Sequence, residues 1–218
     1  MNADMPAPSD KFREPTDRRE LRRDFRKRRR AITPSERLIA ARKIARLLAK
    51  AHLLLPGKRI AVYLAHDGEL DPKDIIQQAH RRQALVYLPV ITSAQNKRMR
   101  FAPINSPPRA WRANRYGIHE PGAIPRLHRS AAQLDVVLLP LVAFDSQGHR
   151  LGMGGGYYDR ALALRGRRNH WHKPLLIGLA YDCQEASSLH NARWDIPLDM
   201  VATPTRLIPT SFSLREKP

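Results

Sequence analysis

Residues 134–160, LDVVLLPLVAFDSQGHRLGMGGGYYDR, contain the elements that decide the fold of this chain. The segment Leu134–Leu141 is apolar apart from Asp135, which is typical of a central parallel strand that is buried on both faces. Four glycines follow within the five positions 152–156, directly before a segment that we predict to be helical to about Leu164. Glycine permits positive φ, and the first N–H groups of a helix have no partner within it, so backbone donors can gather there around an anion.

Charged residues surround this glycine-rich loop. Arg150 and Arg160 flank it and Asp159 could hold a cation, so the loop suits a nucleoside triphosphate with its Mg²⁺. A Walker A loop is excluded because no lysine followed by serine or threonine comes after the glycines. The Rossmann pattern fails because Tyr157 stands in the place of the third glycine and the preceding strand ends too early, near Leu141. A plain connection without a ligand stays open as the alternative.

The composition indicates one globular domain in a reducing compartment. A chain of 218 residues with 42% hydrophobic residues can bury a core of its own. No apolar run approaches the length of a membrane span, and the polar N-terminus lacks the apolar segment of a secretory signal. Cys183 is the only cysteine, so no internal disulfide can form. We therefore expect a cytoplasmic monomer that does not bind a membrane.

The charge of the chain is strongly basic. Its 39 Lys and Arg residues exceed its 20 Asp and Glu residues by 19. Such an excess favours anionic partners, either nucleic acid or anionic small molecules. The run Arg26–Arg30 supports nucleic acid, but it has no interleaved aromatic residue and matches no recognition module. A nucleic-acid-binding protein therefore stays open as one alternative function.

The chain begins with a leader and two helices. Residues 1–17 are predicted to be a disordered basic leader, and residues 18–210 a single α/β domain. The first helix begins at Arg18 and places Leu21 and Phe25 on one face. The second begins with a capping box at 33–36 and runs to about Leu55, with a predicted buried stripe of Leu38, Ala41, Ala45 and Leu48.

Strands and helices then alternate. We expect strands at residues 59–64, 84–88, 99–102, 134–141, 175–180 and 200–202, with helices at 71–82 and after the glycine-rich loop. The segment 105–130, rich in Pro, Gly and Arg, is predicted to be a long loop. This alternation predicts an α/β fold, a three-layer sandwich with a mostly parallel central sheet and helices on both faces.

The glycine-rich segment resembles a family signature. Pro140–Asp145 followed by Gly148–Arg160 is similar to the signature of the 5-formyltetrahydrofolate cyclo-ligase family, whose members are also called methenyltetrahydrofolate synthetases. Three further segments fit the family in the same order, at 21–37, 63–71 and 178–199. The resemblance covers roughly residues 18–204.

This resemblance implies an activity. Members of the family use Mg²⁺ and ATP to close 5-formyltetrahydrofolate to 5,10-methenyltetrahydrofolate, with release of ADP and phosphate. The formyl oxygen is a poor leaving group, and its phosphorylation gives an iminophosphate whose carbon is attacked by N10. The protein then has to position the substrates and neutralise charge during phosphoryl transfer.

The resemblance also implies a nucleotide site and a metal site. Arg150 and Tyr158 are the expected catalytic residues, with Arg150 stabilising charge on the transferred group, and Asp159 and Asp195 are the expected ligands of Mg²⁺. Arg18 stands where the family has lysine, and a guanidinium differs from an ammonium in reach and geometry. The expected ATP contacts come from the first helix and the glycine-rich loop: Arg18, Arg19, Glu20, Leu21, Arg22, Arg150, Leu151, Gly152, Met153, Gly154, Gly155, Gly156, Tyr157 and Tyr158.

A folate site is implied as well. Glu69 is expected to accept hydrogen bonds from the pterin N–H edge, with Leu64 packing near the pterin. Tyr116 and Glu120 match a family loop near the substrate. Pro72 replaces the family's threonine, so any hydrogen bond from that threonine is lost. A sugar-phosphate isomerase or a CoA-transferase relative with the same layers is a further alternative, which ATP dependence would separate from a cyclo-ligase.

Overall fold

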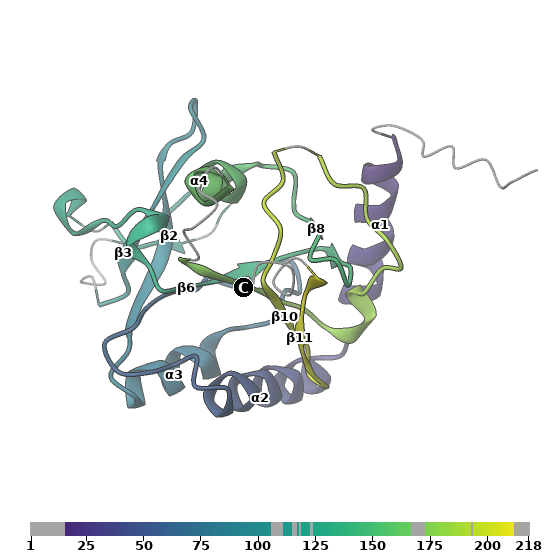
Figure 1. The fold of residues 1–218 in the computed structure, drawn as a ribbon, viewed down its shortest axis with the longest axis horizontal. Helices are drawn as coiled ribbons and strands as arrows, with labels where there is room; N and C mark the ends of the chain where they lie inside the picture. Colours follow the sequence, from purple (N-terminus) through teal and green to yellow (C-terminus); the bar gives the residue numbers. More distant parts are fainter. Residues whose placement is uncertain are drawn as a thin grey trace, which may run out of the picture.

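A seven-stranded sheet runs through the centre of the molecule (Figure 1). The computed structural model describes residues 16–105, 111–114, 117, 119–122, 124–166, 173–192 and 194–211. The strands lie in the order β11-β10-β9-β6-β1-β2-β3; the five from β10 to β2 pair in parallel, and β11 and β3 pair antiparallel at the edges. Their bounds are β1 Arg59–Ala61, β2 Leu85–Ser93, β3 Arg98–Pro103, β6 Val136–Pro140, β9 Leu175–Leu179, β10 Met200–Ala202 and β11 Leu207–Pro209.

Helices cover both faces of this sheet, as predicted. α2 (Pro34–Lys50) and α3 (Lys73–Arg81) lie on one face, and α4 (Tyr157–Gly166) lies on the other, so the fold has three layers (Figure 1). α1 (Thr16–Arg30) lies beside the sheet, next to β8 (Arg150–Leu151), rather than on either face (Figure 1). None of the helices in the described residues combines the length and the apolar character that crossing a membrane requires.

The apolar run of the central strand is explained by burial on both faces. Val136 and Leu138 belong to the core cluster beneath α2 and α3, whereas Val137 and Leu139 belong to the cluster beneath α4. All four side chains are at most 5% exposed. Successive strand residues point to opposite faces, so a strand between two helical layers needs apolar residues at every position.

The second helix differs in part from its prediction. Its capping box is confirmed, since Thr33 Oγ1 accepts from Glu36 N at 3.3 Å and Glu36 Oε2 accepts from Thr33 N at 2.8 Å. The helix ends at Lys50 rather than near residue 55. The placement of Leu38 in the buried stripe is wrong, because it is 50% exposed and lies about 120° around the helix from buried Ile44. The residues that are buried are Ala40, Ala41, Ile44, Ala45 and Leu48.

Several short strands were not predicted from the sequence. The expected loop at 105–130 includes β4 (Arg112–Ala113) and β5 (His119–Glu120), which pair with each other. A second ribbon joins β7 (Ala143–Phe144) to β8 between β6 and α4. The glycine-rich loop therefore follows β8 and not the central strand, which agrees with the exclusion of a Rossmann turn. These strands are two residues long, too short to give an alternating pattern.

The start of the first helix also differs from expectation. α1 begins at Thr16, inside the predicted leader. The leader sequence 1–17 holds Lys11 and Arg13 against four acidic residues, so the basic character that was assigned to it belongs instead to α1. The structure of residues 1–15 lies outside the described part of the chain.

Gly148, in the turn between β7 and β8, provides a test of this packing. Its φ is +91°, and a Cβ there would lie 2.6 Å from the carbonyl oxygen of Leu198. We expect Gly148→Ala to lower the free energy of unfolding in urea by about 2–4 kcal/mol, through unfavourable φ and overpacking together. Gly57→Ala is the matched control, because Gly57 has φ +71° but nothing within 4 Å of the added Cβ. Equal losses in the two variants would contradict the contribution of packing.

Candidate active site

The glycine-rich loop lies between β8 and α4 and contacts α1. Gly154 has φ +94°, a conformation that glycine adopts without the penalty of a Cβ. Arg22 Nε donates to the carbonyl oxygen of Gly152 at 2.9 Å, and Arg26 Nη2 lies 3.2 Å from Met153 Sδ. Segments 130 residues apart in the sequence therefore form one site, in which the basic side of α1 faces the loop.

Five arginines of α1 surround a hollow of about 360 Å³ beside this loop. Burial, followed by the positive charges of Arg18 and Arg26, lowers the pKa of Arg22. A compact polyanion bound in the hollow would relieve this repulsion, as a triphosphate can. The lining residues are Arg19, Arg22, Arg23, Arg26, Arg30 and Met153.

Arg150 and Asp159 meet at the base of the loop. The Arg150 side chain is 5% exposed, and its guanidinium donates to Asp159 Oδ1 and to the carbonyl oxygen of Ile196. The expected charge-stabilising arginine and the expected metal ligand are therefore direct partners. Because the Arg150 side chain is almost fully removed from water and that of Asp159 is partly buried, the pair compensates the charge of Arg150 in particular.

Asp195 joins this group from a separate segment. Its Oδ2 accepts from Arg18 Nη2 at 3.0 Å and from Ala192 N at 3.1 Å. Asp195 thus holds the N-terminal end of α1. The residue that follows it, Ile196, is the one whose carbonyl oxygen accepts from Arg150. Within the described part of the chain, no three His, Cys, Asp or Glu side chains gather closely enough to hold a metal by themselves. Proteins commonly hold Mg²⁺ with one or two carboxylates, while phosphate and water complete its coordination. Asp159 and Asp195 can provide those carboxylates.

Glu69 lies after β1 in a second part of the site. Its Oε2 accepts from His66 N at 3.1 Å, and its Oε1 lies 3.9 Å from Arg29 Nη1. The carboxyl is 8% exposed. Burial raises the pKa of Glu69 to about 7, against the opposing effect of Arg29. A buried carboxylate with unused acceptor capacity is suited to recognise a row of N–H donors.

Tyr158 connects the two parts of the site. Burial raises the pKa of Tyr158, and the negative charge of Glu69 raises it further, whereas Arg150 lowers it. The hydroxyl therefore lies within electrostatic reach of both residues. Tyr63 is fixed in the same region by donating to the carbonyl oxygen of Leu70 at 2.7 Å, and the pKa of Tyr63 is also raised, first by burial and then by Glu69.

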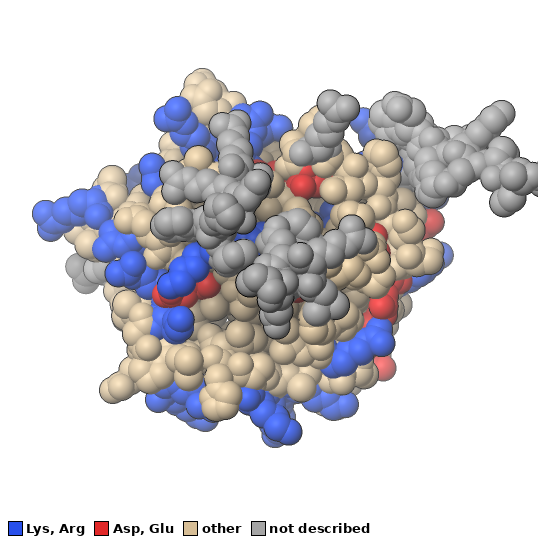
Figure 2. Space-filling view, in the orientation of Figure 1, with Lys and Arg blue, Asp and Glu red and all other residues tan. Residues whose placement is uncertain are grey.

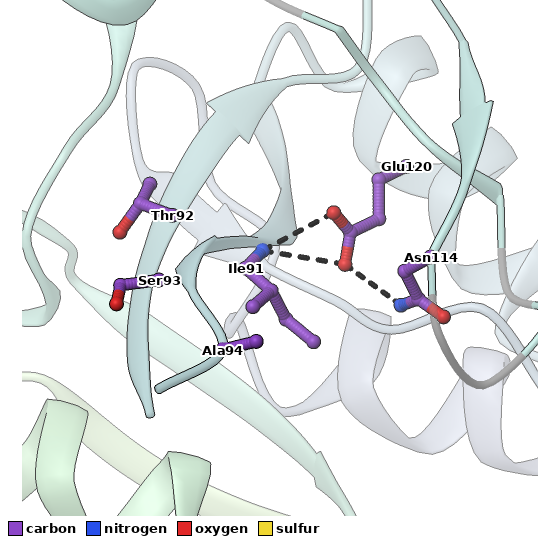
Figure 3. A pocket seen from close by; sticks show the side chains of 6 residues that line it. All are labelled: Ile91, Thr92, Ser93, Ala94, Asn114 and Glu120. Carbon is purple, nitrogen blue, oxygen red and sulfur yellow. Dashed lines mark hydrogen bonds between the residues drawn. The ribbon is translucent and has the colours of Figure 1, made fainter. Parts of the chain in front are cut away.

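Glu120 has structural partners. Both of its carboxylate oxygens lie 3.2 Å from Ile91 N, and Oε1 accepts from Asn114 Nδ2 at 2.7 Å (Figure 3). These bonds fasten the β4–β5 hairpin to β2, beside a cavity of about 230 Å³. The substrate contact predicted for Glu120 stays a prediction, and Tyr116 lies outside the described residues.

The remaining predicted residues differ in their environments. Leu21 and Leu151 pack with buried Phe25, and Leu64 packs against the main core. Glu20 is exposed. Gly155 and Gly156 continue the loop, and Tyr157 is the first residue of α4. Any nucleotide contact of Glu20 or Leu21 stays a prediction.

Arg26, Arg29 and Arg30 were missed as site residues. The sequence showed only a basic run, but Arg26 follows Arg22 by four residues and Arg30 follows Arg26 by four, which places them on one side of a helix. That spacing was an available signal for the hollow. The burial of Arg29, which is 1% exposed, could not be predicted, because nothing in the sequence distinguishes it from the other four basic residues of the run.

The basic surface extends well beyond this site. Figure 2 shows Lys and Arg side chains distributed around the outline of the visible face rather than in one stripe. Within the run proposed for nucleic acid, Arg29 is buried and Arg26 contacts Met153. The residues of this run therefore have different environments: one is buried, some line the hollow and others lie on the outer surface.

Known proteins resemble this chain along most of its length. The chain matches the 5-formyltetrahydrofolate cyclo-ligase family over residues 14–204. A relative from Escherichia coli (strain K12), named 5-formyltetrahydrofolate cyclo-ligase, is 38% identical over 186 residues, covering 84% of this chain and 98% of the relative. A relative of the same name from Haemophilus influenzae is 34% identical over 182 residues, covering 83% of this chain and 94% of the relative.

Solved structures agree with the sequence relatives. The 5,10-methenyltetrahydrofolate synthetase of Aquifex aeolicus has a TM-score of 0.72 at 26% identity, covering 89% of this chain and 93% of that one. That of Mycoplasma pneumoniae has a TM-score of 0.64 at 25% identity, covering 86% and 99%. The resemblance inferred from the glycine-rich signature is confirmed: the chain belongs to the 5-formyltetrahydrofolate cyclo-ligase family and is an enzyme.

Proposed function

We propose that this chain uses ATP and Mg²⁺ to close 5-formyltetrahydrofolate to 5,10-methenyltetrahydrofolate, with release of ADP and phosphate. Family membership supports the folate reaction. The observation that supports phosphoryl transfer is the glycine-rich loop facing an arginine-lined hollow, with Arg150 and Asp159 paired at its base. The proposed enzyme is a monomer that acts in the cytoplasm.

The proposed reaction has two steps. The formyl oxygen attacks the γ-phosphorus of ATP, so that an O–P bond forms and the bond to ADP breaks. N10 of the folate then attacks the activated carbon, the C–O bond breaks, and phosphate leaves with the former formyl oxygen while N10 loses its proton. No bond to the protein forms, so the enzyme acts by positioning and by stabilising charge.

In this proposal α1 and the glycine-rich loop hold the nucleotide. Arg18 and Arg22, with the N–H groups of the loop, surround the phosphates, and Arg150 neutralises charge on the transferred group. Asp159 and Asp195 would hold Mg²⁺, which would supply positive charge to neutralise the phosphate oxygens. The pairing of Arg150 with Asp159 gives both residues a position at the base of the loop from which to reach a phosphate and its metal.

The folate occupies the second part of the site in this proposal. Glu69 accepts from the pterin N–H edge, and Leu64 packs near the ring. Tyr158 stands between the folate and Arg150, which is supported by its electrostatic contact with both Glu69 and Arg150. By resemblance to the family, we also assign Tyr116 and Glu120 to a loop near the substrate.

The main test is a reaction of the purified chain with 5-formyltetrahydrofolate, Mg²⁺ and ATP. We expect the absorbance of the methenyl product to appear only when both Mg²⁺ and ATP are present, because phosphorylation has to precede ring closure. Omission of ATP, or chelation of Mg²⁺ with EDTA, should abolish the signal. Equal product formation without nucleotide would contradict the proposed reaction.

Arg150→Ala should impair catalysis more than folding. Loss of one donor that stabilises developing charge typically lowers kcat by about 10²–10³-fold. Arg160→Ala is the matched control, because Arg160 lies on the neighbouring turn but is exposed. Steady-state kinetics together with thermal unfolding separate the two effects. Near-normal kcat in Arg150→Ala would remove this arginine from the mechanism.

Asp159→Asn and Glu69→Gln should affect different ligands. Asp159→Asn removes a charge that a hard cation prefers, so we expect a higher Mg²⁺ requirement with folate affinity little changed. Glu69→Gln should weaken folate binding by roughly 1–3 kcal/mol, because the amide presents an NH2 donor in place of one acceptor oxygen and leaves a pterin donor unpaired, while nucleotide binding survives. Separate titrations of each variant with Mg-ATP and with folate measure these effects. Loss of the same ligand in both variants would show that the two sites are wrongly placed.

A further inference from the structure

Arg29 is a buried cation that the proposed chemistry does not use directly. It lies in the last turn of α1, and its 1% exposure makes it the largest fully buried side chain among the described residues. Nη2 donates to the carbonyl oxygen of Asp67 at 2.9 Å and to Asp67 Oδ2 at 3.2 Å, and Nη1 donates to the carbonyl oxygen of Leu141 at 3.3 Å. Nη1 also lies 3.9 Å from Glu69 Oε1. Removing a guanidinium from water costs free energy, so the burial of Arg29 needs a structural or functional explanation.

Neighbouring residues already perform two structural tasks that Arg29 could be assigned, the capping of α1 and the fixing of Asp67. Arg37 caps the end of α1, since its Nε donates to the carbonyl oxygen of Ile32 at 2.9 Å and its Nη2 to that of Arg30 at 3.0 Å. Arg30 Nε binds Asp67 Oδ1 at 2.6 Å from the outside. What Arg29 adds is contact with Glu69 and with the carbonyl oxygen that follows the central strand.

The same helix also reaches the nucleotide part of the site. Arg18, Arg22 and Arg29 recur at intervals of four and seven residues, so they lie on one side of α1. Arg18 contacts Asp195, and Arg22 contacts the loop at Gly152. At 1.5 Å per residue, the distance along the axis from Arg18 to Arg29 is about 16 Å. One rigid helix therefore connects the proposed phosphate site to the turn that carries Glu69.

We propose that Arg29 is the positioning residue for Glu69: it favours the ionised form of this carboxylate and fixes the 67–69 turn on the helix that also holds the nucleotide loop. The inference rests on the proposed function, because it assigns Glu69 to folate recognition. Arg29 does not touch the substrate in this assignment and acts only through Glu69.

The charges around Glu69 set the direction of the expected effect. Arg29 and Arg26 face it from α1, Asp67 and the His66 N–H from its own turn, Tyr63 from the segment after β1, and Tyr158 from α4. Burial raises the pKa of Glu69 to about 7, and Arg29 is the strongest opposing influence. Loss of the Arg29 charge should raise this pKa further. The carboxyl is then protonated at neutral pH and presents a donor where pterin N–H groups need an acceptor.

The test compares Arg29→Gln with Arg30→Gln. The two arginines share Asp67 as a partner, but only Arg29 is buried against Glu69. The Glu69 carboxyl is titrated by ¹³C NMR in the absence of substrate, with Glu69→Gln used to assign its signal. We expect the pKa to rise by at least about one unit in Arg29→Gln and to stay near 7 in Arg30→Gln.

Kinetics provide the second measurement. A one-unit rise lowers the ionised fraction at pH 7 from about one half to about one tenth, so KM for 5-formyltetrahydrofolate should rise about fivefold there. KM should return toward the wild-type value as the pH rises through the new pKa, with kcat changed less. A purely structural role for Arg29 would instead lower activity equally at every pH.

Each outcome bears on the proposal separately from the overall function. An unchanged Glu69 pKa in folded Arg29→Gln overturns the proposal. If Arg29→Gln does not fold, Arg29→Met and Arg30→Met are compared, because methionine removes the charge and keeps an unbranched side chain that suits a buried position. The Glu69 pKa should then rise only in Arg29→Met, and equal values in both variants overturn the proposal. Failure of the wild type to form the methenyl product would refute the proposed function, whereas the substrate-free titration would still report on the Arg29–Glu69 contact.

Discussion

The docking of α1 against the segments that leave the central sheet is the constraint on which the candidate site depends. Phe25 packs with Val142, Ala143 and Leu151, and Arg29 binds the carbonyl oxygen of Leu141. These contacts fix the helix beside the β7–β8 ribbon instead of on a face of the sheet. Its exposed arginines then line the hollow at the glycine-rich loop, and its buried arginine reaches Glu69. Without this helix, both parts of the site would lose one wall.

The sequence allowed prediction of the layers and of the loop because each leaves a local pattern. Val136–Pro140 is apolar at every position since both faces are covered, and the glycines at 154 and 156 mark positive φ. Leu38 was wrongly predicted to be buried because α2 has several apolar residues and its sequence does not show which side of the helix faces the sheet. The strands of the β7–β8 ribbon are only two residues long, so they leave no alternating pattern. The partners of Arg29 lie 38 and 112 residues away along the chain, so no local pattern could reveal them.

The basic residues that give the net charge of +19 have several different roles in this molecule. Arg29 is buried and hydrogen-bonded, Arg22 and Arg26 face the hollow, and Arg30 holds Asp67 from the outside. Residues of one type in one helix thus serve packing, anion attraction and loop fixation, according to which side of α1 they occupy. The total charge alone could not distinguish a nucleic-acid surface from a small anionic site, whereas the division of these arginines among partners favours the small site for those that contact the loop.

The pairing of Arg150 with Asp159 bears on which form of nucleotide suits the loop. The Arg150 side chain is 5% exposed and the Asp159 side chain 24%, so Arg150 above all needs an opposite charge if it loses its partner. A free polyphosphate could satisfy Arg150 but would bring negative charge toward Asp159. A free cation could satisfy Asp159 but would repel Arg150. A metal–polyphosphate complex supplies a negative group to the first and a positive ion to the second, so the exchange leaves no buried charge uncompensated. This balance of charges is a physical reason why the proposed co-substrate is the metal complex and not ATP alone.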